Sequence, residues 1–356
     1  MTIRIPVTVI TGFLGAGKTT LIANLLKNAH SKRIALIINE FGNVGVDGAL
    51  LSDCADAACQ KQDVVELANG CICCTVADDF IPTMEMLLAR DPAPDHIVIE
   101  TSGLALPQPL LQAFSWPEVK ARATVDGVVT VVDTPAVAEG RFAANVTAVE
   151  SQRAADENLN HESPLHELFE DQLACADLIV LNKTDLMTQD AVESVNRLID
   201  REKRSETQVV HAVQGNLPAA LIIGQGASAE DDLAARNSPA SHAHHHAHHD
   251  DEGQAAHDHD EFESFVINVP PARQTQDVEQ TVAGIMKRYS ILRAKGFIAI
   301  HNKPMRLAVQ AVGPRVQSYF DRRWQDDEVQ QGRLVVIGFK GLDQQAISEE
   351  LGRISL

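Results

Sequence analysis

The feature that most constrains this chain is the glycine-rich segment Gly12-Phe13-Leu14-Gly15-Ala16-Gly17-Lys18-Thr19, which fits the pattern G-x-x-x-x-G-K-[ST]. A β-rich apolar run precedes it at residues 5–10, and a helix-compatible stretch follows at residues 19–28. In such a loop the glycines let backbone N–H groups point at phosphate oxygens, the lysine neutralises the β- and γ-phosphates, and the threonine hydroxyl coordinates Mg²⁺. We therefore expect a phosphate site formed by Gly12, Gly15, Ala16, Gly17, Lys18, Thr19 and Thr20.

Apolar runs rich in Val, Ile and Leu alternate with longer amphipathic stretches through the first two thirds of the chain. The expected strands are residues 5–10, 34–38, 64–67, 97–99, 128–132, 178–181 and 209–213. The expected helices include residues 19–28, 80–89 and 191–201. This alternation predicts an α/β fold with a doubly wound, mostly parallel sheet, whose ligands bind beyond the carboxyl ends of the strands.

A second motif, Asn182-Lys183-Thr184-Asp185, follows the expected strand at residues 178–181. An aspartate at this place accepts hydrogen bonds from the N1–H and exocyclic amine of guanine, a pair that adenine lacks. We therefore expect Asn182, Lys183 and Asp185 to bind a guanine nucleotide, with backbone contacts from residues 211–216.

A third motif, Glu100-Thr101-Ser102-Gly103, follows the expected strand at residues 97–99. An acid at this strand end is placed to hold the Mg²⁺ shell, and the Gly103 N–H is placed to reach the γ-phosphate. The alternative for Glu100 is an acid that only caps a turn.

Three cysteines fall within four positions, in Cys71-Ile72-Cys73-Cys74. Thiolates bind soft and borderline metals such as Zn²⁺, Co²⁺ and Cu⁺, and three of them leave one tetrahedral position for an exchangeable ligand. We expect Cys71, Cys73 and Cys74 to bind a metal ion in transit, with a redox pair or chance packing as alternatives.

The loop after the expected strand at residues 34–38 carries two candidate acids. Glu40 is a candidate further metal ligand, and Asp47 is a candidate to orient Mg²⁺ or an attacking water. The alternative for both is that they are ordinary loop acids.

Composition excludes several classes of function. Only 4% of the 356 residues are aromatic and the formal net charge is −19, which argues against generic binding of nucleic acid or of an anionic membrane. The first strand begins without a signal-peptide pattern, so we expect a cytoplasmic protein with reduced thiols. We expect Cys54 and Cys59 to be free thiols and Cys175 to be a core residue.

The chain divides into three parts by composition. Residues 1–226 form the expected nucleotide-binding domain, and residues 227–261 form an acidic linker that contains eight of the fourteen histidines. The histidines suit labile metal binding, and a low-complexity spacer is the alternative. Residues 262–356 form an expected α+β domain, with strands at 262–269 and 334–339, a helix at 277–289, and a hairpin of 291–300 with 305–312.

The motifs, taken in order, resemble the CobW family of metal-handling P-loop GTPases, which is related to the nickel GTPases HypB and UreG. The resemblance covers nearly the whole chain, including the histidine-rich linker and the C-terminal domain. It implies GTP hydrolysis with Lys18, Thr19, Glu100 and Asp47 in catalytic roles, with Thr19 also a ligand to Mg²⁺.

The same resemblance implies a metal cargo and a client. The sequence around the motifs is similar to that of the family branch associated with aerobic cobalamin biosynthesis. This similarity implies a Co²⁺ chaperone that supplies a cobaltochelatase. Other branches of the family handle Zn²⁺ with the same motifs, so a zinc chaperone for a zinc enzyme stays open. A metal buffer whose GTP site is only structural is the third alternative.

Overall fold

The computed structural model describes residues 4–29, 32–39, 64–67, 80–155, 165–236, 262–313, 315–325 and 328–355. These residues form two compact units, one on each side of a boundary between Gly253 and Gln254. Several candidate residues lie outside the described ranges, namely Glu40, Asp47, Cys54, Cys59, Cys71, Cys73, Cys74 and the linker histidines.

The first unit is built on a seven-stranded parallel sheet of order β3-β2-β4-β1-β5-β6-β7. Its strands are β1 (Ile5–Thr11), β2 (Ile34–Asn39), β3 (Val64–Leu67), β4 (His96–Glu100), β5 (Ala123–Asp133), β6 (Leu178–Asn182) and β7 (Gln208–Ala212). Each of the seven predicted strands is confirmed, with ends that shift by a few residues. The strand order reverses beside β1, so the nucleotide loop after β1 lies where such sheets bind ligands.

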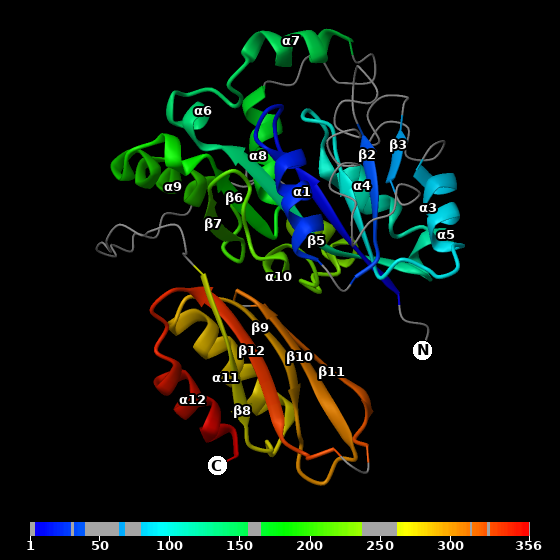
Figure 1. Ribbon diagram of the computed structural model, residues 1–356, viewed down its shortest axis with the longest axis vertical. Helices are drawn as coiled ribbons and strands as arrows, with labels where there is room; N and C mark the ends of the chain where they lie inside the picture. Colours follow the sequence, from blue (N-terminus) through cyan, green and yellow to red (C-terminus); the bar gives the residue numbers. More distant parts are fainter. Residues whose placement is uncertain are drawn as a thin grey trace. The chain divides into compact units, whose positions relative to one another are not determined.

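Helices connect these strands (Figure 1). They are α1 (Lys18–Asn28), α3 (Ile81–Leu88), α4 (Pro107–Ala113), α5 (Pro117–Lys120), α6 (Thr134–Ala138), α7 (Val146–Ala155), α8 (Leu165–Cys175), α9 (Gln189–Glu202) and α10 (Ala219–Ile222), with the short turn η3 (Thr184–Leu186). Successive residues of the central strands, such as Ile97, Val98 and Ile99, are all fully buried. The sheet is therefore covered on both faces, as the near-continuous apolar strands predicted.

Strand β5 starts five residues before its predicted start at residue 128. The prediction relied on apolar runs and omitted the first half of the strand, because that half contains the polar residue Asp126, which is 4% exposed. Its carboxylate accepts hydrogen bonds from the backbone N–H groups of Gly224, Gln225 and Gly226, so a buried charge is satisfied inside the strand.

The expected linker started too early, because residues 227–236 pack against the first unit as η4 (Ala229–Asp231) and η5 (Leu233–Arg236). Glu230, which is 3% exposed, accepts hydrogen bonds from the Thr124 hydroxyl at 2.5 Å and from the Val125 N–H at 2.9 Å. Arg236 is fully buried against Asp177. The prediction missed this because it counted apolar side chains, whereas buried charged groups attach this segment.

The second unit is a five-stranded antiparallel sheet of order β11-β10-β9-β12-β8. Its elements are β8 (Phe262–Val269), α11 (Thr275–Arg288), β9 (Ile291–Ile298), β10 (Met305–Val312), β11 (Arg315–Arg323), β12 (Gly332–Phe339), α12 (Gln344–Gly352) and η7 (Arg353–Ser355). The predicted α+β class and the hairpin are confirmed. Strand β11 and helix α12 were not predicted. Within the described ranges, no helix combines the length and apolar character needed to cross a lipid bilayer.

Candidate functional site: the nucleotide loop and its supports

The loop between β1 and α1 requires glycine at two positions. Gly12 has φ +133°, and a Cβ atom there would lie 2.1 Å from the Val131 carbonyl oxygen. Gly17 has φ +103°, and a Cβ atom there would lie 2.3 Å from Asn182 Nδ2. Helix α1 then begins at Lys18 without a side-chain cap, so its first N–H groups are directed into the loop, as phosphate binding requires.

The Lys18 side chain lies inside this loop and is 7% exposed. Its ammonium donates hydrogen bonds to the carbonyl oxygens of Gly12 at 2.9 Å and of Phe13 at 3.4 Å. The cation is therefore held at the centre of the loop, where a phosphate oxygen is expected to bind.

The predicted Mg²⁺ residues lie together. The Thr19 hydroxyl donates to Glu100 Oε1 at 3.1 Å, because Glu100 ends β4 in register with Ile10 of β1. Gly103 approaches the phosphate loop closely, since a Cβ atom there would lie 2.7 Å from the Leu14 N. The sheet thus brings the first and third motifs to one place.

Asn182 connects the phosphate loop to the loop after β7. Its side-chain amide donates to the Ala16 carbonyl at 2.9 Å, and its side-chain oxygen accepts from the Gly215 N–H at 2.9 Å. Both contacts are within the protein, and Asn182 is 2% exposed. The structure therefore gives Asn182 a supporting position between the two loops that were expected to bind the nucleotide.

Lys183 takes a similar position through a residue that sequence reasoning missed. Its ammonium donates to the Gly15 carbonyl at 2.7 Å and to Asp133 Oδ2 at 2.6 Å. Asp133 ends β5, is 2% exposed, and pairs in register with Asn182. An acid at the end of a buried strand, followed by Thr134-Pro135, was the available signal for this contact.

Asp185 differs from these two residues because it is exposed, in the turn η3. Thr184 beside it donates to the Ala212 carbonyl at 3.3 Å, which ties η3 to the end of β7. His211 in β7 contacts Asn196 at 3.1 Å, and burial lowers the pKa of its imidazole, so the neutral form is favoured. The Asp185 carboxylate is accessible to a base, and the segments around it are fixed.

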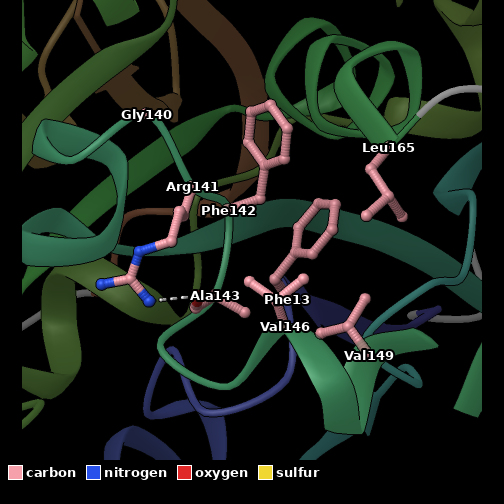
Figure 2. A pocket seen from close by; sticks show the side chains of 8 residues that line it. All are labelled: Phe13, Gly140, Arg141, Phe142, Ala143, Val146, Val149 and Leu165. Carbon is pink, nitrogen blue, oxygen red and sulfur yellow. Dashed lines mark hydrogen bonds between the residues drawn. The ribbon is translucent and has the colours of Figure 1, made fainter. Parts of the chain in front are cut away.

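An apolar cavity lies behind the phosphate loop (Figure 2). Its volume is about 190 Å³, and its lining residues are Phe13, Gly140, Arg141, Phe142, Ala143, Val146, Val149 and Leu165. Phe13 belongs to the phosphate loop and packs against Phe142 with ring centroids 5.6 Å apart. The loop is therefore anchored by an aromatic contact to the segment between α6 and α7, for which the sequence suggested no role.

The candidate metal ligands follow two adjacent strands. The last residues of β2 and β3, Asn39 and Leu67, are paired in register. Glu40 is the next residue after Asn39, and Cys71 follows Leu67 by four positions. Among the described residues themselves, no three His, Cys, Asp or Glu side chains converge as a metal site.

Cys175 is a core residue, as predicted. It is fully buried, and burial raises the pKa of its thiol to about 12, so it does not ionise near neutral pH.

Residues 6–211 match the family description "CobW/HypB/UreG, nucleotide-binding domain", and residues 262–355 match "Cobalamin synthesis protein cobW C-terminal domain". The zinc chaperone CobW of a Sinorhizobium species is 52% identical over 346 residues, which cover 97% of this chain and 95% of the relative. The zinc chaperone CobW of Pseudomonas aeruginosa is 50% identical over 352 residues, which cover 98% of this chain and 91% of the relative. The zinc-regulated GTPase metalloprotein activator 1 of Schizosaccharomyces pombe is 37% identical over 198 residues, which cover 55% of this chain and 43% of the relative. The chain therefore belongs to the family of the CobW, HypB and UreG nucleotide-binding domain, carries the CobW C-terminal domain, and is a GTPase.

Proposed function

We propose that this GTPase is a metallochaperone that binds a divalent metal ion in its GTP-bound state and delivers it to a client protein. The observation that carries the proposal is the register of the sheet edge. Ile38 pairs with Glu100, whose carboxylate contacts Thr19 of the phosphate loop. The carboxyl end of β2, which Glu40 follows in the sequence, therefore lies beside the nucleotide site, and β3 pairs with β2 on the side away from β4.

Guanine selectivity is assigned to Asp185. Its side chain is exposed in η3, directly after Asn182 and Lys183, which contact the carbonyl groups of the phosphate loop. A carboxylate there accepts from the guanine N1–H and amine, and adenine offers no matching pair of donors.

Thr19 and Glu100 suit an Mg²⁺ ion that accompanies GTP. A hydroxyl and a carboxylate are the oxygen ligands that Mg²⁺ prefers, and these two are 3.1 Å apart at the entrance to the loop. Bound there, the ion would neutralise charge on the β- and γ-phosphates. Lys18 and the loop N–H groups would hold the same phosphates, Gly103 would donate its N–H to the γ-phosphate, and Asp47 is proposed to orient the attacking water.

The cargo site is assigned to Cys71, Cys73, Cys74 and Glu40. Zn²⁺ is the first candidate, because the two relatives that are at least 50% identical over most of the chain are named zinc chaperones. Co²⁺ is the second candidate, because it accepts the same thiolate and carboxylate ligands. If Co²⁺ is the cargo, the proposed client is a cobaltochelatase. We place the delivery in the cytoplasm, where thiolates stay reduced.

The test is a titration of Zn²⁺ and of Co²⁺ against the full chain, with Mg²⁺ and either GDP or a non-hydrolysable GTP analogue. We expect the GTP analogue to raise the affinity of the preferred ion about 5- to 150-fold, the usual range of allosteric coupling. Linkage requires the ion to raise affinity for the analogue by the same factor.

Two variants and one control make the test specific. Cys71→Ala and Cys73→Ala should remove the tight metal phase and leave binding of the GTP analogue nearly unchanged. Cys175→Ala should keep both, because that thiol is buried in the core. Equal metal affinity in the two nucleotide states would contradict the chaperone mechanism.

A further inference from the structure

Within the described residues of the second unit, helices pack against one face of the sheet only. Helices α11 and α12 pack on that face (Figure 1), and their apolar residues share a core with alternate residues of the strands, such as Ala294 of β9 and Val336 of β12. The opposite face, here called the outer face, carries the other alternate residues. Its side chains include Tyr319, Val266 and Val335, which are 52%, 51% and 40% exposed.

The outer face is basic, although the chain as a whole is acidic. Three cross-strand rows can be followed across all five strands; one of them is Tyr319, Ala308, Phe297, Arg333 and Asn268. Lys295 and Arg333 stand in these rows at exposed positions and Arg315 at a half-buried one. Arg293 also stands in them but is only 5% exposed, and the rows contain no acidic residue. The whole chain has a net charge of −19, whereas residues 262–356 carry thirteen basic and ten acidic side chains.

The sequence directly before β8 has the complementary charge. Residues 250–261 contain six acids, and residues 237–261 contain no lysine or arginine. The segment joins the sheet at Phe262, the first residue of β8. Phe262 alternates in register with Ser264 and Val266, so it belongs to the outer face, where its ring stacks on Phe339 with centroids 5.5 Å apart.

The length of the segment is sufficient to cross the outer face. Twelve extended residues span up to about 40 Å, whereas five strands spaced at about 4.8 Å are about 20 Å wide. Attachment at Phe262 also gives the segment a millimolar effective concentration at the face, so individually weak surface ion pairs suffice.

We propose that residues 250–261 dock on the outer face of the second unit, with their carboxylates against Lys295, Arg315 and Arg333. The interaction is independent of the GTPase function proposed above. It keeps a basic and partly apolar sheet face covered within the same chain.

The test uses full-length protein in metal-free buffer and a fluorescent synthetic peptide of residues 250–261, followed by anisotropy. The host is a variant in which the six acids of the segment are neutralised: Asp250→Asn, Asp251→Asn, Glu252→Gln, Asp258→Asn, Asp260→Asn and Glu261→Gln. We expect the peptide to bind this variant and to be released as salt is raised from about 0.05 to 0.5 M. Wild type should bind the peptide at least about tenfold more weakly, because its own segment competes.

Two pairs of substitutions in the neutralised host locate the interaction. Lys295→Gln with Arg333→Gln should weaken peptide binding about tenfold, because the double variant loses two surface ion pairs with the peptide. Arg273→Gln with Lys287→Gln removes the same charge from exposed positions at and before α11 and should leave binding unchanged. Absence of binding to the neutralised host would overturn the proposal, as would equal losses in the two pairs. Equal binding to the neutralised host and to wild type would show that an acidic partner from outside, and not this segment, is the occupant.

Discussion

At the scale of single residues, the side chains of the guanine motif divide between support and recognition. Asn182 is 2% exposed, its side-chain NH₂ donates to the Ala16 carbonyl, and its side-chain oxygen accepts from the Gly215 N–H. Asp185, three residues later, is exposed. A buried amide with both ends satisfied fixes two loops relative to each other, and an exposed carboxylate remains available for a ligand.

This division predicts opposite outcomes for two substitutions. Asn182→Ala leaves the Ala16 carbonyl and the Gly215 N–H without their partner, so we expect stability to fall by about 1–3 kcal/mol. Affinity for GTP and for xanthosine triphosphate should then fall together. Asp185→Asn should lower the affinity for GTP about 30- to 1000-fold. It should also gain affinity for xanthosine triphosphate, because xanthine offers the opposite hydrogen-bond pattern.

Calorimetric titration of both nucleotides against both variants, with urea unfolding of each, measures these effects. A gain of xanthosine triphosphate in Asn182→Ala would show instead that Asn182 contacts the base.

The sequence identified these residues but not their contacts within the protein. Lys183 was expected to bind the nucleotide, and the motif does not specify the contacts of its ammonium with Gly15 and Asp133. The motif specifies residue types at a strand end, whereas the direction of a side chain depends on which strand lies beside it. The pairing of Asp133 with Asn182 across β5 and β6 is a long-range fact that no local pattern encodes.

At the scale of elements, the phosphate loop depends on the apolar cavity beside α7 (Figure 2). Phe13 is 2% exposed and packs on both Phe142 and Phe169. We expect Phe13→Ala to lower stability by about 3 kcal/mol and to raise the KM for GTP, because the loop loses its anchor.

Val149→Ala is the matched control, since Val149 lines the same cavity from α7 and belongs neither to the phosphate loop nor to its aromatic contact. It should lower the melting temperature while leaving the KM for GTP within about threefold. Steady-state GTPase kinetics with thermal unfolding measures both quantities. Equal KM values for the two variants would mean that the cavity does not control the loop.

The strand residues that sequence analysis missed share a physical cause. Strand β11 is an edge strand with the sequence RVQSYFDRR, so few of its side chains enter the core and no apolar run marks it. The first half of β5 contains Asp126, a buried acid that backbone N–H groups satisfy. Strands with apolar residues on both faces, such as β4 and β6, were predicted because burial alone determines their composition.

At the scale of the whole molecule, a buried ion pair attaches the last described segment of the first unit to its sheet. Arg236 is fully buried and contacts Asp177 at 2.7 and 3.0 Å, directly before β6. Arg236→Ala removes two charged hydrogen bonds from Asp177, whose carboxylate keeps Arg204 at 3.2 Å and the Val128 N–H at 3.0 Å. We therefore expect it to cost about 2 kcal/mol of unfolding free energy. Lys203→Ala, which breaks a more exposed pair with Asp200, should cost less than about 1 kcal/mol. Urea unfolding of both variants decides, and similar values would contradict the attachment.

The positions of the motifs predict that the histidine-rich tract is dispensable for turnover. The three motifs expected to contact phosphate, Mg²⁺ and base, at residues 12–20, 100–103 and 182–185, all lie outside residues 241–259. Arg236 is the last described residue before the tract, and its buried contact with Asp177 is independent of the tract. We therefore expect deletion of residues 241–259, with Arg236 kept, to leave the rate of GTP hydrolysis within about twofold and to reduce the number of weakly bound metal ions. GTPase assays and equilibrium dialysis with Zn²⁺, on the deletion and on wild type, measure the two effects. A deletion variant that folds normally but loses GTP hydrolysis would show that the tract belongs to the active site.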